Sequence, residues 1–355
     1  MSQAEIADYG ATRDGVMVRR MVLRNARGMS VGVLDYGGVI TDVNVPDRDG
    51  VMGNVVLGCS NIGDYQTKSS YFGALLGRYA NRIAGAKFSL DGEVFHLPAN
   101  NGANTLHGGP KTGATPNFAH RVWEIVRAEA QAVTLRLVSA DGDNGFPGTL
   151  TVEVTYTLGA EDALRIDYAA RVEGRATVLN LSNHTYFNLA GSGSALDHEV
   201  MIPAGHFLPT DAAQIPTGIL LSVAGTPMDF RTPQVAGARI RDEFEQIVLA
   251  GGYDHCFVLD KPEAAMGPAA QVRDAASGRV LTIETDQPAV QFYTGNKLDG
   301  TIPGSHGALI RAGDGMAFET QHFPDAPNRP HFPSTRLDPG EEFRSTTIWR
   351  FGVGA

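Results

Sequence analysis

The sequence predicts an all-β fold, a sandwich or a barrel built from many short strands. Apolar and polar residues alternate with a period of two in several stretches, as half-buried strands require. The 42 glycines and 19 prolines are spread along the chain and separate these stretches by turns. The 3.6-residue period of an amphipathic helix is nearly absent. Many short strands with few helices are typical of a sandwich or a barrel.

The clearest strands are expected at residues 149–158 and 164–168, which are joined by a turn at 159–162. Two alternating stretches around a short turn predict a β-hairpin. Further strands are expected at residues 132–138, 178–181, 256–259, 280–284, 289–293 and 346–351. Short helices are expected at residues 60–65, where Asn61 and Asp64 can cap a turn, and at 238–244. No repeat or change in composition divides the chain, so residues 1–355 are expected to form a single domain.

The composition favours a small neutral ligand. Hydrophobic residues make up 43% of the chain and charged residues 19%, which is ordinary for a globular protein. With 29 basic and 39 acidic residues the net charge is −10, which argues against a nucleic acid partner because such binding relies on lysine and arginine. No run approaches the roughly 18 apolar residues that a membrane helix needs, so no membrane partner is expected.

The N-terminus and the cysteines predict a cytoplasmic location. Residues 1–8 carry acids where a signal peptide has a basic start and an apolar stretch. Cys59 and Cys256 are far apart in the sequence, and in a chain without an export signal two such thiols are expected to be reduced.

Polar clusters between the strands supply candidate site residues. Asn81 and Arg82 lie in a segment at 77–83, and His107 lies in an asparagine-rich segment at 100–109. Arginine offers a planar fork of donors to vicinal hydroxyls, and histidine can donate or accept. Asparagine-rich loops also form Asx turns, so a structural role is the alternative for these residues.

Three later segments add further candidates. His184 follows an apolar stretch, where a lone histidine is more often a core residue, and Asp254 begins a strand, where an acid often closes a turn. Glu319 follows apolar residues, so desolvation can raise its pKa and make it a useful base, and the alternative is a solvated surface glutamate, which is the more common case. Gln291 lies in a stretch at 290–296 that mixes amide and aromatic side chains, which suits the apolar face and the hydroxyls of a sugar.

Other catalytic inventories are missing from the sequence. There is no GxSxG elbow, P-loop, GxGxxG after a strand, CxxC pair or HExxH motif. His107, His184 and His322 lack the close spacing of zinc ligands. No cofactor and no metal are therefore expected.

Taken in order, the segments resemble the aldose 1-epimerase (galactose mutarotase) family from about residue 33 to residue 351. The matching pieces are DYGG at 35–38, VPDRDG at 45–50, GRYANRIAG at 77–85, LPANNG at 97–102, NTLHGG at 104–109, NHTYFNL at 183–189, YDH at 253–255, QFYTGN at 291–296, ETQHFPD at 319–325 and FPST at 332–335.

The resemblance implies a large antiparallel β-sandwich and an isomerase that interconverts the α and β anomers of free aldoses such as galactose or glucose. By the same resemblance, Glu319 is the general base and His184 the general acid. The implied ligands of the sugar hydroxyls are Arg82, His107 and Asp254, with Asn81 and Gln291 as lesser contacts.

Two departures from the family pattern leave the preferred sugar open. Cys256 stands where asparagine is common, and residues 308–310 replace a more aromatic approach to Arg311. The alternatives are a glycosidase that uses Asp254 and Glu319, and a non-catalytic sugar-binding protein on the same fold. A sugar-phosphate epimerase would need a cationic cluster, and only Arg78 and Arg82 are evident near the motifs. A monomer and a homodimer are both compatible with the sequence.

Overall fold

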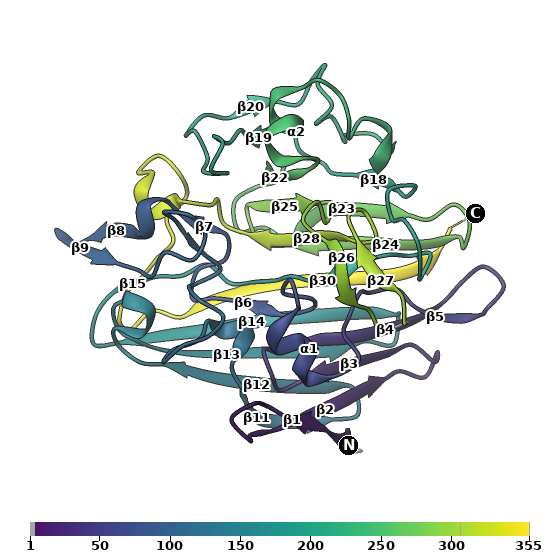
Figure 1. Cartoon of the computed structure of the whole chain (residues 1–355), viewed down its shortest axis with the longest axis horizontal. Coiled ribbons are helices and arrows are strands. Elements are labelled where there is room, and N and C mark those ends of the chain that lie inside the picture. Colours follow the sequence, from purple (N-terminus) through teal and green to yellow (C-terminus); the bar gives the residue numbers. More distant parts are fainter. Residues whose placement is uncertain (1–3, 306, 355) are drawn as a thin grey trace.

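The computed structural model describes residues 4–305 and 307–354, so the first three residues of the N-terminal segment lie outside the described part. In that part the chain is mostly strands with two short α-helices, and the paired strands form three large antiparallel sheets (Figure 1). This architecture confirms the expected β-sandwich. No helix among the described residues has the length and apolarity that would let it cross a membrane.

A nine-stranded sheet forms the largest layer. In spatial order its strands are β11 (Glu124–Glu129), β12 (Ala132–Ser139), β13 (Thr149–Leu158), β14 (Ala163–Glu173), β30 (Phe343–Val353), β24 (Arg279–Thr285), β23 (Gly267–Arg273), β18 (Glu199–Met201) and β21 (Gln234–Val235).

Two further sheets lie against it. The five-stranded sheet consists of β1 (Glu5–Ala11), β2 (Met17–Arg24), β3 (Ser30–Leu34), β4 (Ile40–Pro46) and β5 (Met52–Asn54). The six-stranded sheet consists of β17 (Tyr186–Phe187), β28 (Met316–Gln321), β25 (Ala289–Tyr293), β22 (Asp254–Val258), β19 (His206–Leu208) and β20 (Leu221–Ser222).

Short strand pairs, two α-helices and several 3-10 turns complete the described chain. The pairs are β6 (Leu75–Leu76) with β16 (Ser182–Asn183), β7 (Arg82–Ile83) with β10 (Thr105–Leu106), β8 (Lys87–Leu90) with β9 (Glu93–His96), β15 (Thr177–Val178) with β29 (Arg336–Leu337), and β26 (Asp299–Pro303) with β27 (Leu309–Arg311). The α-helices are α1 (Ile62–Thr67) and α2 (Glu245–Ala250).

The hairpin predicted from the alternating pattern is confirmed. Strand β13 pairs antiparallel with β14 from Thr149 opposite Glu173 to Leu158 opposite Leu164. Every second side chain of β13 is buried, as its period of two requires. The strand expected at residues 289–293 is confirmed as β25.

One hydrophobic core joins the sheets. Phe187 of β17 packs edge-to-face on Trp349 of β30, with ring centroids 4.9 Å apart. The hydroxyl of Tyr156 on β13 donates a hydrogen bond of 2.7 Å to the carbonyl oxygen of Gly38, in the turn between β3 and β4. Because these contacts connect distant parts of the sequence, the core fixes the two smaller sheets relative to the large one. Figure 1 places β19, β20 and α2 at the end opposite β1 and β2.

The strand expected at residues 178–181 is wrong as a continuous element. Its start belongs to the two-residue strand β15, and Asn180 then forms an isolated parallel bridge with Tyr79. The next residues form β16. The extended segment pairs in turn with β29, with Tyr79 and with β6, and a period of two does not reveal such changes of partner.

The first helix prediction is confirmed and the second is wrong. Asn61 caps α1, where its side-chain oxygen accepts a hydrogen bond of 2.9 Å from the backbone N–H of Asp64. Helix α2 begins only after residue 244, and Gly251 ends it with a φ of 68°. Its position is fixed by a tertiary contact: the Gln246 amide exchanges two hydrogen bonds, of 2.7 and 3.0 Å, with the backbone of Thr210.

Candidate active site

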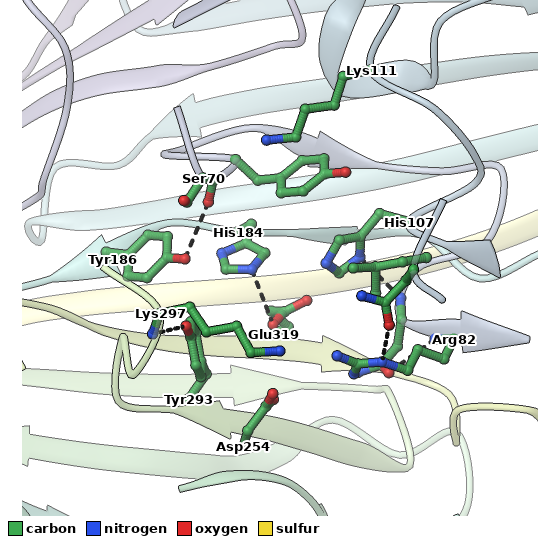
Figure 2. A pocket seen from close by; sticks show the side chains of 14 residues that line it. Ser70, Arg82, His107, Lys111, His184, Tyr186, Asp254, Tyr293, Lys297 and Glu319 are labelled. Atoms are coloured by element: carbon green, nitrogen blue, oxygen red, sulfur yellow. Dashed lines mark hydrogen bonds and ion pairs between the residues drawn. The ribbon is translucent and has the colours of Figure 1, made fainter. Parts of the chain in front are cut away.

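A cavity of about 150 Å³ lies where the loops that carry the predicted site residues meet the six-stranded sheet (Figure 2). It contains six of the seven site residues named from the sequence. The residues that line it are Ser70, Tyr71, Asn81, Arg82, Asn101, Leu106, His107, Lys111, His184, Tyr186, Asp254, Tyr293, Lys297 and Glu319.

The six-stranded sheet positions the acidic residues. Glu319 lies in the middle of β28, directly opposite Gln291 on β25. Asp254 begins β22, as expected, and is opposite Tyr293 on β25. Gln291 is the one predicted residue that does not line the cavity. Its Nε2 instead donates a hydrogen bond of 2.7 Å to Oδ1 of Asp254. Gln291 therefore holds the Asp254 carboxylate from outside the cavity lining.

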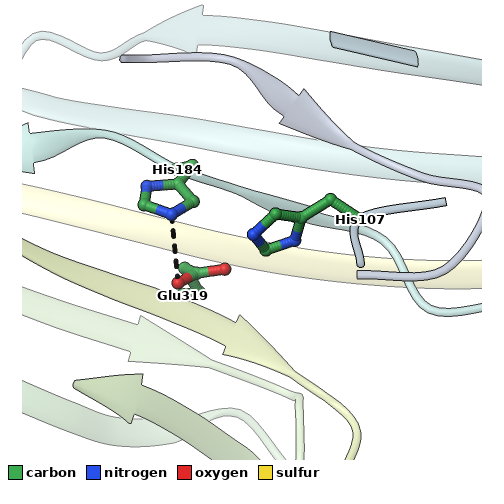
Figure 3. Close-up of side chains that lie close together, drawn as sticks. All are labelled: His107, His184 and Glu319. Atoms are coloured by element: carbon green, nitrogen blue, oxygen red, sulfur yellow. Dashed lines mark ion pairs between the residues drawn. The ribbon is translucent and has the colours of Figure 1, made fainter. Parts of the chain in front are cut away.

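His184 lies between β16 and β17, and its backbone holds it in place. Its N–H donates to the carbonyl oxygen of Ala74, and its own carbonyl oxygen accepts from the N–H of Gly73. Its ring is stacked on Tyr186, with ring centroids 4.8 Å apart. Nε2 of His184 lies 3.6 Å from Oε1 of Glu319 (Figure 3).

Both members of this pair are almost completely buried, at 5% exposed for His184 and 2% for Glu319. Burial, with a smaller contribution from Asp254, raises the pKa of Glu319 well above its usual value. Burial lowers the pKa of His184. The low-dielectric surroundings therefore favour a pair that is uncharged overall and carries one exchangeable proton.

His107 and Asn81 form a rigid corner of the site. The backbone N–H of Asn81 donates to Nδ1 of His107, and the N–H of His107 donates to the carbonyl oxygen of Asn81. Both residues have left-handed φ values, 62° for Asn81 and 51° for His107, a region that residues other than glycine adopt uncommonly. The following Gly108 has a φ of 80°, and a Cβ there would lie 2.1 Å from the carbonyl oxygen of Gly77. The chain thus turns sharply enough to aim His107 into the cavity.

The tautomer of His107 decides what its ring can do. Burial and the nearby cations lower its pKa, so the ring is neutral. Since Nδ1 accepts the backbone hydrogen bond, the ring proton is on Nε2, which is a donor. His107, His184 and Glu319 offer ligand atoms within 4.8 Å of one another. A metal would need the Nε2 lone pair of His107, however, so this hydrogen bond argues against a metal centre and for a donor to a ligand oxygen.

Arg82 and Asp254 face the same cavity and are held by amides. Nε of Arg82 donates a hydrogen bond of 3.0 Å to Oδ1 of Asn101, and its Nη2 donates one of 2.6 Å to Oε1 of Gln214. Oδ2 of Asp254 accepts 2.6 Å from Nε2 of Gln214. Hydroxyl groups can use the remaining donors and lone pairs of these side chains.

Several lining residues were missed from the sequence. Nζ of Lys111 lies 4.6 Å from the centre of the Tyr71 ring and donates a hydrogen bond of 2.8 Å to the carbonyl oxygen of Ser69. Lys297 donates 2.9 Å through Nζ to Oε1 of Gln214. Lys111 follows the NTLHGG segment and Lys297 follows QFYTGN, so closeness to a motif was the only available signal.

These lysines correct the expected charge of the site. Arg78, counted above as a cation near the motifs, is 2% exposed and donates to the backbone oxygens of Pro147 and Gly148. It is a structural residue outside the cavity lining. The cations that do line the cavity are Arg82, Lys111 and Lys297.

The two departures from the family pattern lie away from the cavity. Cys256 is 2% exposed and belongs to a small hydrophobic cluster with Phe323 and Phe332. Residues 308–310 line a separate cavity of about 50 Å³.

Comparisons with known proteins agree along nearly the whole chain. A family model described as aldose 1-epimerase matches residues 19–350. Galactose mutarotase of Mus musculus is 44% identical over 341 residues, covering 96% of this chain and 95% of the relative. Aldose 1-epimerase of Escherichia coli K12 is 38% identical over 341 residues, covering 95% and 96%. The crystal structure of galactose 1-epimerase from Lactobacillus acidophilus matches with a TM-score of 0.86 and 30% identity over 100% of both chains.

Proposed function

The chain belongs to the aldose 1-epimerase family, and from that premise we propose how its own residues exchange the anomers of a free aldose. The protein is an isomerase of the mutarotase type. We propose galactose as a substrate because the mouse relative is a galactose mutarotase. The observation that carries the mechanism is the buried pair of His184 and Glu319, 3.6 Å apart in one cavity.

Anomer exchange needs one group that takes a proton and one that gives a proton. In the proposed reaction, ring opening starts from the form of the pair in which its one proton has moved from Glu319 to His184. The Glu319 carboxylate removes the proton of the C1 hydroxyl while protonated His184 gives its proton to the ring oxygen O5. The C1–O5 bond breaks, and C1 becomes the aldehyde of the open-chain sugar. Glu319 then holds a proton and His184 is neutral, so the total number of protons on the pair is unchanged.

The return step uses the same groups in reverse. Rotation about C1–C2 presents the other face of the aldehyde to the O5 hydroxyl. Neutral His184 takes the O5 proton, O5 attacks C1, and protonated Glu319 gives its proton to the C1 oxygen. Burial favours the uncharged pair, which is the protonation state that the open-chain sugar meets. The pair is thus suited to stabilise the intermediate.

The remaining predicted residues hold the sugar. We propose that Nε2–H of His107 donates to a sugar oxygen, and that Arg82 and Asp254 bind neighbouring hydroxyls. Asn81 supports His107 through the two backbone hydrogen bonds between them. Gln291 acts through Asp254, whose Oδ1 it binds. Fixing the hydroxyls keeps the open-chain aldehyde in position for reclosure.

The alternative functions have less support. Both carboxylate oxygens of Asp254 accept hydrogen bonds from amides, which suits a hydroxyl ligand better than a glycosidase nucleophile. A non-catalytic sugar-binding protein would have no need for a buried acid/base pair. The relatives over nearly the full chain are epimerases, which favours neither alternative.

We also propose a domain organisation, a location and an oligomeric state for the chain. We propose that residues 1–355 act as one domain, supported by the family match over residues 19–350. We propose a cytoplasmic protein, supported by the two free, buried cysteines. A small-molecule aldose is the proposed partner, nucleic acid and membranes are not, and the protein is proposed to act as a monomer or a homodimer.

Polarimetry tests the proposed function directly. Protein treated with a chelator and given no nucleotide is expected to speed the optical-rotation change of freshly dissolved α-galactose. Heat-denatured protein is the control for buffer catalysis. A rate equal to that control would reject the function, and a rate lost on chelation and restored by a metal ion would reject the metal-free mechanism.

A further inference from the structure

Gln214 connects three charged side chains around one end of the cavity. It lies on the loop between β19 and β20. Its Oε1 accepts hydrogen bonds from Nη2 of Arg82 (2.6 Å) and from Nζ of Lys297 (2.9 Å). Its Nε2 donates 2.6 Å to Oδ2 of Asp254. Figure 2 shows Arg82, Lys297 and Asp254 among the side chains around the cavity.

The amide of Gln214 meets these three requirements together. Arginine and lysine can only donate, and an ionised carboxylate can only accept. The side-chain amide of Gln214 must therefore present its oxygen to the two cations and its NH₂ group to Asp254. Within residues 4–305 and 307–354, neither Arg82 nor Lys297 makes an ion pair within 4.0 Å. The Gln214 oxygen is the acceptor that both cations share.

The loop is held in place before any ligand arrives. Oδ1 of Asp211 accepts hydrogen bonds from the N–H groups of Ala213 (2.8 Å) and Ile215 (3.0 Å), which closes the turn. The Gln246 amide binds the backbone of Thr210 at the base of this turn. Gln214 itself has a φ of 60°, in the left-handed region that a glutamine rarely adopts. The turn thus keeps an unfavourable backbone conformation that aims the amide at the charged residues.

We infer that Gln214 is a positioning residue that determines hydroxyl specificity, because it holds Arg82, Lys297 and Asp254 as one recognition unit. It does not line the cavity, so it acts through these three side chains. Together they offer donors and an acceptor, which matches a hydroxyl group that accepts and donates at once. The inference rests on the proposed function and adds Lys297 to the residues that recognise the sugar.

The test compares Gln214→Met, which keeps the length but removes the amide, with Gln214→Gly, which also relieves the left-handed backbone. Gln131→Met, at an exposed turn, is the matched control. Polarimetry gives KM and kcat, and calorimetry gives the affinity for galactose and for its monodeoxy analogues. Thermal unfolding shows that each variant is folded.

Both Gln214 variants are expected to raise KM for galactose about tenfold with little change in kcat, since the lost bonds are made to charged groups. Gln214→Gly is expected to unfold at the same or a higher temperature than the parent protein. For one monodeoxy galactose, which lacks the hydroxyl that the unit binds, parent and variants are expected to bind equally. Lys297→Met is expected to raise KM by a similar factor. The double variant of Lys297→Met and Gln214→Met is expected to raise KM by less than the product of the two single factors.

Two outcomes would overturn the inference. One is an unchanged galactose affinity in both folded variants. The other is an equal loss of affinity for galactose and for every monodeoxy analogue, which would indicate a general structural role. Calorimetry does not require turnover, so the role of Gln214 in binding can be tested even if the parent protein shows no epimerase activity. Such a lack of activity would reject the proposed function alone.

Discussion

His184 and Glu319 lie side by side in the cavity, and each keeps one buried polar atom without a hydrogen-bond partner among the described residues. Nε2 of His184 is 3.6 Å from Oε1 of Glu319, whereas Nδ1 of His184 and Oε2 of Glu319 are buried without a hydrogen-bond partner among the described residues. Unpartnered buried polar atoms are costly and call for an explanation. Both side chains also line the cavity, so the place beside these polar atoms is suited to a polar ligand.

Replacement of Glu319 by glutamine is expected to lower kcat at least about 100-fold, because the amide keeps the shape but cannot take a proton. The measurement is polarimetry on protein whose fold is checked by circular dichroism. Glu173→Gln, at an exposed position, is the control and is expected to keep the parent rate. Near-normal turnover of folded Glu319→Gln protein would refute the assignment of the base.

His184→Asn is expected to lower kcat by a similar factor, since asparagine cannot give a proton to the ring oxygen. The two groups act in one proton exchange, so the double variant with Glu319→Gln should lose far less than the product of the single losses. Kinetics of all three variants measure this coupling. Fully multiplicative losses would mean that the residues act independently.

The pH profile of kcat/KM is expected to be bell-shaped with a broad plateau. The active pair carries one proton and is uncharged overall, and burial disfavours the forms with two protons or none. The lowered pKa of His184 places the acid limb below the usual histidine range, and the raised pKa of Glu319 places the basic limb above the usual glutamate range. Rates measured from about pH 4 to about pH 9 test this, and a single variant of either residue should show only one limb.

Arg82→Ala and Asp254→Ala are each expected to raise KM for galactose by about tenfold or more, with a smaller effect on kcat. Hydrogen bonds from charged side chains to hydroxyls act in both the ground state and the transition state, so their loss weakens binding throughout. Polarimetry over a range of sugar concentrations separates the two constants. Arg13→Ala, at an exposed position, is the control, and unchanged kinetics in both site variants would remove these residues from the site.

Stability is expected to fall as the pH drops below about 6.5. Burial lowers the pKa of His120 to about 3 and of His255 to about 4, so the unfolded chain binds protons that the folded protein does not. The free energy of unfolding keeps its full value above the pKa of the unfolded histidine. Below that pKa it falls by about 1.4 kcal/mol per pH unit for each such histidine, until the pH reaches the folded pKa. Asp35 and Glu319 act in the opposite direction, since burial raises the pKa of Asp35 to about 6 and that of Glu319 well above its usual value.

Thermal unfolding between pH 7 and pH 5 measures this dependence. His255→Gln is expected to reduce the slope, because glutamine does not titrate, and His206→Gln, at an exposed position, is the matched control. An unfolding temperature that is constant or rises toward pH 5 would contradict the prediction.

The sequence by itself determined the local features of the fold. The period of two gave the hairpin of β13 and β14 because burial on one face of a strand depends only on alternate residues. Asn61 marked the start of α1 because capping is a contact within one turn. The ordered motifs identified the family, and with it the residues that meet in the cavity.

Only the tertiary structure decided how those residues are held. Lys297 and Gln214 are 83 positions apart in sequence, and Gln214 and Arg82 are 132 apart, so no local pattern indicates that one amide joins them. The start of α2 depends on a contact between Gln246 and Thr210, and the pairing of residues 178–181 depends on segments from both ends of the chain. Such contacts arise when distant loops pack on a common sheet, and the physical reason they escape the sequence is that they depend on distances in space, which spacing along the chain does not encode.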